Sequence, residues 1–462
     1  MVLARLLSPK DFGLVGMVTA VIGVFSLFRD FGLSAAVVQR ATVTEEQIST
    51  LFWINMAVGV LLGLLSVAIA PAIAAFYHEP HLFAVTAVLA LGFLFNAMGI
   101  QHSAILQRQM RFTALAVINT VGMMVGAAIA ILGALAGYGY WALVAMTVTL
   151  PLATTIGVWL TATWVPGWPH RRVGIPSLMR FGGTLTLQGL LVYAATNVEK
   201  VLLGRFWGAD AIGIYGRAYQ LINIPTDNVN TPAGEVAFAG LSRVKDDPSR
   251  LKSYFLKGYS LLLGLTLPIT IACALFADDI ISVFLGPKWK AATVILRLLA
   301  PTILVFAIAN PIGWLLTSIG QVGRLLKMNL VITPIMIAGY VIGLPYGPKG
   351  VAFAYSTLMT LWLVPLVIWA LHDAVILPRD ILQTLSRPMA SSLVAGALAF
   401  AVRSACGQAF APLPRLVLES AVLLITFAAM LLFVTGQKSL YLGLLRELRG
   451  SSTVKENALV SP

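Results

Sequence analysis

Eight charged residues inside or at the ends of long apolar segments of this sequence are candidates for chemistry. The cations are Arg29, Lys200, Arg217 and Arg297, and the carboxylates are Asp30, Glu199, Asp227 and Glu235. An ionisable side chain at membrane depth is costly unless it pairs or faces water, so each is a functional candidate. Arginine binds phosphate through its bidentate fork, which makes the cations candidates for a substrate-binding cavity. Carboxylates removed from water favour their neutral form, so the acidic residues are candidates for ion coupling.

A structural role is the alternative for the two adjacent pairs, Arg29–Asp30 and Glu199–Lys200. Their side chains could reach the membrane interface or pair locally. Neighbouring residues on a helix point about 100° apart, so the two members of a pair need not bind each other.

The segment 208–238 is unusually polar for a membrane span and contains Pro225 and Pro232 as well as Asp227 and Glu235. Proline-broken helix is tolerated at membrane depth only where protein or a water-filled cavity satisfies the backbone. We therefore expect this segment to line a central cavity, with its two carboxylates as the first candidates for proton or sodium coupling. A re-entrant or interfacial stretch is the alternative.

The composition indicates that lipid surrounds most of these 462 residues. Hydrophobic residues make up 59% and charged residues 11%, against about 25% charged residues in soluble domains. The net charge of +13 comes from residues between apolar segments, so we expect membrane lipids and no nucleic acid as partners.

The predicted fold class is all-α, a polytopic membrane protein with about thirteen transmembrane helices of about 20 residues each. Helices satisfy their own backbone groups, which lipid cannot do. Lys and Arg gather in alternate loops, which the positive-inside rule assigns to the cytoplasm together with the C-terminus. The expected spans lie near 12–38, 48–76, 82–107, 112–136, 139–164, 179–204, 208–238, 252–275, 290–319, 322–344, 349–371, 386–404 and 413–435.

Three matches in the same order indicate two duplicated halves, a common design in transporters. They are 3–16 with 203–216, 137–145 with 347–355, and the basic pair Arg108 and Arg111 with Arg324 and Lys327. Arg205 follows a complete span, whereas its counterpart Arg5 follows four residues, so the first helix of the first half is expected to be missing. The expected domains are an N-terminal lobe of five spans (1–178), a C-terminal lobe of six (179–372), two extra helices (373–440) and a cytoplasmic tail (441–462).

Several segments resemble lipopolysaccharide and exopolysaccharide flippases of the Wzx/WzxC type, which belong to the MOP exporter superfamily with MATE and MurJ. They are VLARLLSPKDFGLVGM, TEEQISTLFWIN, LQRQMRF, LLGRFWGADAIGIYGRAYQL and LSRVKDDPSRLKSYF. The resemblance runs from Val2 to about Trp369. It implies two pseudo-repeated helical lobes around a central cavity plus two C-terminal helices, in the bacterial inner membrane.

The resemblance further implies translocation of undecaprenyl-pyrophosphate-linked oligosaccharide by alternating access, usually coupled to an ion gradient. Other polysaccharide-assembly proteins are then candidate partners. The alternatives are a MATE-like small-molecule exporter, a membrane polysaccharide polymerase or glycosyltransferase, and a scaffold without transport. The enzyme alternative would require a large periplasmic loop, for which the spans leave no room. The sequence has no Walker A motif, no dinucleotide-binding loop and no metal-type histidine spacing, so we expect no cofactor and no metal.

Overall fold

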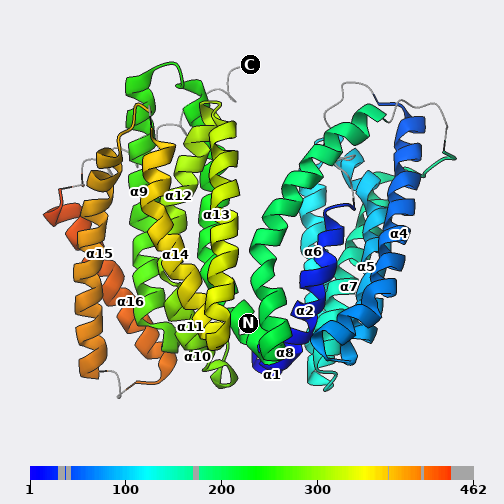
Figure 1. Cartoon of the computed structure of the whole chain (residues 1–462), viewed down its shortest axis with the longest axis horizontal. Helices are drawn as coiled ribbons and strands as arrows, with labels where there is room; N and C mark the ends of the chain where they lie inside the picture. The colour runs from blue at the N-terminus through cyan, green and yellow to red at the C-terminus, as the bar shows by residue number, and fades with distance from the viewer. Residues whose placement is uncertain are drawn as a thin grey trace, which may run out of the picture. The chain divides into compact units, whose positions relative to one another are not determined.

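The computed structural model describes residues 1–29, 37, 43–169, 176–372, 374–406, 410–436 and 438, and this part of the chain is helical without strands (Figure 1). Ten of its helical segments are long and apolar enough to cross a membrane. The all-α prediction is confirmed, and the number of thirteen spans is approximate. The principal helices are α1 (Val2–Leu6), α2 (Pro9–Ser26), α4 (Glu45–Tyr77), α5 (His81–Arg108), α6 (Phe112–Leu135), α7 (Tyr140–Ala162), α8 (Pro176–Arg243), α9 (Pro248–Leu275), α10 (Ala277–Phe284), α11 (Ala292–Leu299), α12 (Pro301–Ser318), α13 (Val322–Gly343), α14 (Gly347–Ala370), α15 (Pro378–Cys406) and α16 (Pro412–Ala429).

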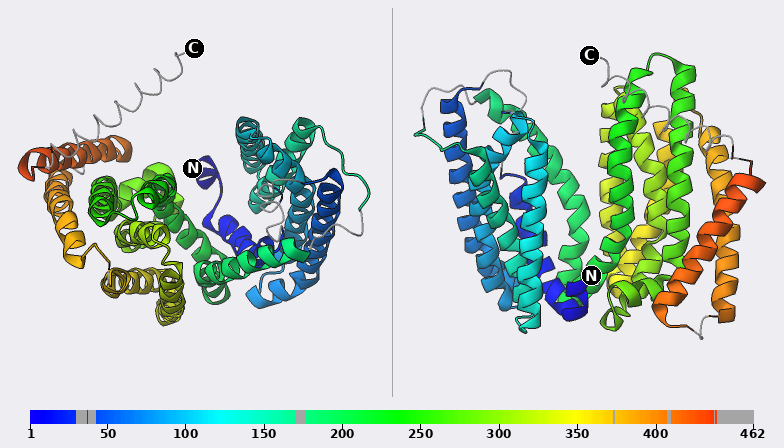
Figure 2. Two further views of the ribbon diagram at one scale, coloured as in Figure 1. Left: turned by 90° about the horizontal axis from the view of Figure 1, so that it is seen from above. Right: turned by 180° about the vertical axis from the view of Figure 1, so that it is seen from behind.

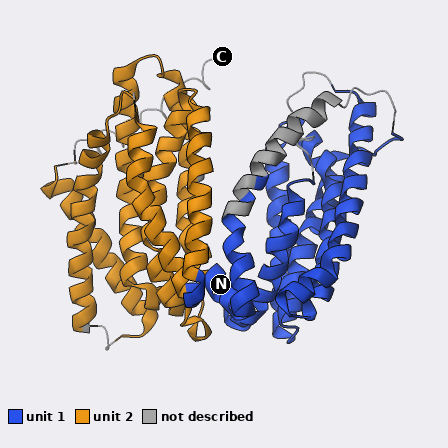
Figure 3. Ribbon diagram, in the orientation of Figure 1, with its two compact units in different colours: residues 1–216, 344–348 blue, residues 217–343, 349–462 orange. Residues whose placement is uncertain are grey.

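The chain forms two compact units, which Figure 3 shows in separate colours. Unit 1 comprises residues 1–216 and 344–348, and unit 2 comprises residues 217–343 and 349–462. Helices α2 and α4 to α7 belong to unit 1, α9 to α13 belong to unit 2 with α15 and α16, and α8 contributes to both.

Capping boxes begin two of the helices in unit 1. The Ser8 hydroxyl accepts a hydrogen bond from the Asp11 backbone N–H at the start of α2, and the Asp11 carboxylate accepts one from the Ser8 backbone N–H at 2.8 Å. Thr44 and Gln47 form the same arrangement before α4. Each box satisfies backbone donors that have no partner within the helix.

Replacing Ser8 by alanine should therefore lower the free energy of unfolding by about 1 kcal/mol, the usual cost of losing an N-cap. Ser8→Thr retains a hydroxyl acceptor and is the matched control. Thermal unfolding of the purified protein, monitored by circular dichroism, measures the difference. A melting temperature for Ser8→Ala equal to that of Ser8→Thr would contradict the capping role.

The two spans expected at 179–204 and 208–238 are two helices that meet at a sharp kink at Gly208, where φ is +78°, and the label α8 covers both. Glycine has no Cβ and adopts this left-handed conformation at little cost. We expected the prolines to break the second span, but helix continues through Pro225 and Pro232. Each proline removes one backbone hydrogen bond while keeping a helical φ. Helix α8 tolerates this loss, and the nearby Thr226 hydroxyl adds a hydrogen bond of 2.9 Å to the Ile222 carbonyl.

The repeated segments 3–16 and 203–216 pack against each other inside unit 1. A Cβ on Gly13 would overlap the backbone carbonyl of Ala209, and a Cβ on Gly213 would overlap the backbone carbonyl of Pro9. At a shift of 200 residues, Pro9 corresponds to position 209 and Gly13 to Gly213. The contact is therefore reciprocal, as expected when two copies of one motif meet across a pseudo-two-fold axis.

One arginine of each basic pair noted in the sequence contacts the C-terminal end of a helix. Arg111 donates to the Thr161 carbonyl at 3.1 Å, near the end of α7. Arg324 donates to the carbonyls of Ala370 and His372, at 3.2 and 2.6 Å, at the end of α14. In both halves an arginine at the start of one helix thus satisfies carbonyls at the C-terminal end of the next, where a cation is favoured.

In unit 2, helices α15 and α16 pack on each other, with α16 running obliquely to α15 (Figure 2). A buried apolar cluster joins Ala395 and Ala399 of α15 to Leu423 and Phe427 of α16, and it includes Phe276 beside α10. Helix α15 also packs on α9. The last two helices are therefore part of the packed core of unit 2.

Candidate functional site

Unit 1 contains a cavity between α2, α5, α6 and α7, whose larger chamber is mainly apolar and whose smaller chamber is mainly polar. It consists of two adjoining chambers of about 630 and 250 Å³ that share Arg29, Asn96, Asn119 and Thr154 in their linings. We call these two chambers together the unit 1 cavity. Its volume lies within the range of about 300–1,000 Å³ typical of small-molecule sites.

Local hydrogen bonds orient the polar side chains of the cavity. The Asn96 amide nitrogen donates to the Gly92 carbonyl one turn earlier at 2.7 Å, which leaves the amide oxygen available as an acceptor. The Thr154 hydroxyl donates to the Leu150 carbonyl at 3.0 Å, and its oxygen can still accept a bond. A Cβ on Gly92 would meet no atom within 4 Å. The absence of a side chain there keeps this part of the wall open.

Pro151 lies in the wall of the larger chamber. It lies inside α7 and has no N–H, so it cannot donate to the carbonyl of Thr147 four residues earlier. Thr147 and Pro151 both line this chamber. A missing helical hydrogen bond of this kind is tolerated at membrane depth beside a cavity.

The electrostatics of the cavity favour an anion. Arg29, just beyond the end of α2, is half-buried and lines both chambers. A guanidinium in a partly dehydrated site attracts phosphate more strongly than the same group in bulk water. The cavity can thus bind a phosphorylated group through Arg29 and hydroxyl-rich groups through its amides and threonines.

The other candidates of unit 1 lie elsewhere. Glu199 is buried on α8, with 2% of its surface exposed. Its neighbour Lys200 donates to the Asn197 amide oxygen at 2.7 Å, one turn back on the same helix. Asp30 lies outside the described residues. Among the candidates that the structure describes, Arg29 alone belongs to the cavity lining.

The candidates of unit 2 occupy separate places. Arg217 donates to the side-chain oxygen of Gln220, and Asp227 and Glu235 are exposed on α8. Arg297 pairs with Asp278 at 2.9 Å.

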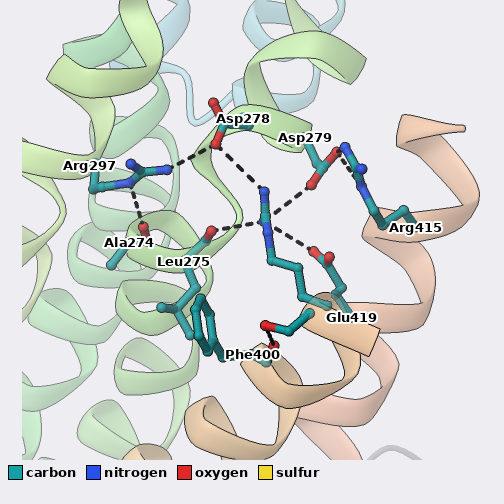
Figure 4. Close-up of polar contacts among 10 residues, drawn as sticks. Ala274, Leu275, Asp278, Asp279, Arg297, Phe400, Arg415 and Glu419 are labelled. Carbon is teal, nitrogen blue, oxygen red and sulfur yellow. Dashed lines mark hydrogen bonds and ion pairs between the residues drawn. The ribbon is translucent and has the colours of Figure 1, made fainter. Parts of the chain in front are cut away.

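Arg297 belongs to an ionic cluster between α10, α11, α15 and α16, in which Figure 4 labels Arg297, Asp278, Asp279, Arg415 and Glu419. Arg403 contacts three carboxylates of this cluster, Asp278, Asp279 and Glu419, at 3.6, 3.2 and 3.5 Å. Arg415 also binds Asp279, through a hydrogen bond of 2.9 Å from its Nε. With three arginines and three carboxylates, the cluster is balanced in charge and is suited to joining helices.

Sequence reasoning missed the uncharged lining of the cavity. Asn96, Asn119 and Thr154 lie on three different helices, and none of them carries the charge that distinguishes the predicted candidates. The available signal was an amide side chain within an apolar helix, because such groups usually face a partner or a polar interior rather than lipid. Their convergence with Arg29 depends on how α2, α5, α6 and α7 pack.

Comparison with known proteins places the chain among polysaccharide biosynthesis proteins. The family with that description matches residues 2–294. The teichuronic acid biosynthesis protein TuaB of Bacillus subtilis (strain 168) is 31% identical over 294 residues, which span 63% of this chain and 61% of TuaB. The lipopolysaccharide biosynthesis protein WzxC of Escherichia coli (strain K12) is 26% identical over 352 residues, covering 74% of this chain and 70% of WzxC.

Solved structures show the same fold at low sequence identity. The lipid II flippase MurJ in an inward closed conformation superposes with a TM-score of 0.74 at 14% identity, covering 93% of this chain and 95% of MurJ. An inward-facing multidrug resistance transporter of the MATE family in the MOP superfamily gives a TM-score of 0.65 at 13% identity, covering 83% and 93%. These likenesses confirm the all-helical, polytopic fold.

Proposed function

Because this chain belongs to the polysaccharide biosynthesis protein family, we propose that it translocates polyprenyl-pyrophosphate-linked oligosaccharide units across the bacterial inner membrane. The observation that carries the proposal is the unit 1 cavity, in which Arg29 lies among amide and hydroxyl side chains. TuaB and WzxC, named for teichuronic acid and lipopolysaccharide biosynthesis, support a glycan-bearing substrate. The MurJ-like fold supports translocation of a lipid-linked headgroup.

The proposed chemistry follows from the cost of moving a charged glycan through lipid. Arg29 binds the pyrophosphate, whose oxygens match the guanidinium fork. Asn96, Asn119 and Thr154 exchange hydrogen bonds with sugar hydroxyls, which replaces part of the water that those groups lose. The polyprenyl chain stays in the bilayer, because moving this hydrocarbon chain from lipid into a hydrated cavity would be unfavourable.

The transport cycle that we propose is alternating access between an N-terminal lobe (1–178) and a C-terminal lobe (179–372), with the C-terminus in the cytoplasm. Gradient coupling requires a carboxylate that binds and releases a cation. Among the acidic candidates that the structure describes, Glu199 is buried, whereas Asp227 and Glu235 are exposed. Glu199 is therefore the first candidate for coupling.

The experiment measures flipping of a fluorescent polyprenyl-pyrophosphate-linked oligosaccharide in proteoliposomes that contain the purified full chain. Arg29→Ala should slow the initial rate by about tenfold or more, because a hydrogen bond to a charged group contributes about 1.5–3 kcal/mol. Arg29→Lys should retain part of the rate, since it keeps the charge without the fork. Arg250→Ala is the control, because that arginine is 72% exposed beside the start of α9.

Three results would overturn parts of this proposal. An Arg29→Ala rate equal to that of the Arg250→Ala control would remove the cavity from the transport path. Absence of flipping by the wild-type chain, together with export of small organic cations, would favour the small-molecule exporter. A change in glycan chain length without a block in translocation, in cells that lack their own flippase, would favour a polymerase.

A further inference from the structure

A second polar pocket lies in unit 2, between α9 and α15. Lys252, near the start of α9, pairs with Asp380, near the start of α15, at 2.7 Å. The two helices pack on each other and therefore run in the same direction from this ion pair. Lys257 and Arg387 follow on the same two helices, about 8 and 10 Å further along the helix axes at the usual rise per residue. They thus lie one to two turns deeper than the ion pair.

Lys257 and Arg387 line a pocket of about 720 Å³. Its other polar groups include the hydroxyls of Ser253 and Ser260 and the amide of Gln383. Among the lining residues that the structure describes, the carboxylate is that of Asp380, and its charge is already neutralised by Lys252. Neither Lys257 nor Arg387 forms an ion pair with any residue that the structure describes. The pocket therefore has an excess of positive charge next to hydrogen-bond donors.

An apolar groove of about 590 Å³ adjoins this pocket. It runs between the second half of α8 and α9, over Trp314 of α12, and its walls include Val236 and Leu261. Lys257 lines both the groove and the polar pocket. One cation thus marks the boundary between a hydrophobic channel and a cationic, hydroxyl-bearing pocket. This division of polarity matches a molecule with an anionic head and a hydrocarbon tail.

We propose that this site binds an anionic glycerophospholipid of the surrounding membrane. Its phosphate lies between Lys257 and Arg387, its polar head contacts Ser253 and Gln383, and an acyl chain follows the groove toward Trp314. The depth of the cations fits this ligand. Helix α9 has 28 residues, or about 42 Å, whereas the hydrocarbon layer is about 30 Å thick. Long cationic side chains near such helix ends extend to lipid headgroups.

A phospholipid is a ligand that fits both parts of the site. Its phosphodiester carries one negative charge, which Lys257 and Arg387 can hold, and its acyl chain can occupy the apolar groove. A pyrophosphate with a large glycan requires a wider polar enclosure, such as the unit 1 cavity. The site is thus distinct from the transport cavity, and its occupancy does not depend on the proposed function.

The test measures lipid retention by the purified full chain in nanodiscs, using phosphatidylglycerol and zwitterionic phosphatidylcholine as probes. Native mass spectrometry should show about tenfold preferential retention of phosphatidylglycerol. The double variant Lys257→Gln with Arg387→Gln should lose this preference while keeping polar side chains of similar length. Lys290→Ala, which removes an exposed cation elsewhere in unit 2, should keep it. Equal preference in the wild type and the double variant would overturn the proposal.

A second measurement does not depend on any charge substitution. Phosphatidylglycerol with brominated acyl chains should quench tryptophan fluorescence, and Trp314→Phe should remove part of that quenching. Quenching unchanged by Trp314→Phe would exclude an acyl chain from the groove. A competition experiment distinguishes the phosphate sources: if polyprenyl phosphate displaces phosphatidylglycerol at equal concentration, the assignment to a glycerophospholipid is wrong.

Discussion

Replacing Gly13 or Gly213 by alanine should destabilise unit 1 by about 2 kcal/mol or more, although alanine is the better helix former. On propensity alone, alanine in a helix gains about 1 kcal/mol over glycine. Packing opposes this gain, because a Cβ at either position would overlap a backbone carbonyl of the facing segment. Backbone cannot rotate away as a side chain can, and overpacking a core commonly costs about 1–3 kcal/mol or more. The steric penalty should therefore exceed the gain in propensity.

Gly216→Ala is the matched control for these two variants. Gly216 lies on α8 three residues after Gly213, and a Cβ there would meet no atom within 4 Å. The control should leave the melting temperature of the detergent-purified protein unchanged or raise it slightly. Gly13→Ala and Gly213→Ala should lower it by similar amounts, because their contacts are reciprocal. Variants as stable as the wild type would show that the two repeated segments do not approach this closely.

The second large effect is expected from Arg403→Met in the ionic cluster of unit 2. Arg403 contacts Asp279 and Glu419, whose residues are 0% and 1% exposed, and it donates to the Leu275 carbonyl at 2.9 Å. Removing one partner of a buried ion pair typically costs about 3–5 kcal/mol, because a charge is left without compensation. Since α15 and α16 both contribute to the cluster, the loss should loosen their packing. Thermal unfolding measures the change.

A double-mutant cycle identifies the origin of that effect. Glu419→Gln removes a negative charge near Arg403, so adding it to Arg403→Met should restore part of the lost stability. Arg250→Ala breaks a solvent-exposed pair with Asp247 and should cost about 1 kcal/mol or less. If Arg403→Met changes stability no more than Arg250→Ala does, the cluster does not hold these helices together.

The sequence predicted much of the fold because the physical signals were local. Long apolar runs with few charges indicated membrane helices, and most predicted boundaries lie within a few residues of the observed ones, as for α5 and α6. The repeat was recognisable because Gly13 and Gly213 occupy equivalent positions, and at both of them a side chain would overlap the backbone of the facing segment. The passage of helix through Pro225 and Pro232 was not expected, because the tendency of proline to break a helix was given too much weight.

The candidate site was only partly predictable from the sequence. Arg29 stood out because a charge beside an apolar run is expensive to bury. Asn96, Asn119 and Thr154 carry no charge and lie far apart along the chain, so nothing local connects them with Arg29. The ionic cluster around Arg297 was hidden in the same way: Arg297 pairs with Asp278, but Arg403 and Glu419 of the same cluster lie more than a hundred residues further along the chain.

By itself, the sequence determined that this protein is a helical membrane protein with a duplicated pattern, because hydrophobicity and backbone satisfaction act along each segment. The tertiary structure decided which polar groups converge. It placed Arg29 with amides and hydroxyls in a cavity, Arg297 in an ionic cluster, and Lys257 with Arg387 beside an apolar groove. These outcomes depend on the packing of distant helices, in which the cost of burying a charge is offset only by partners that the fold brings together.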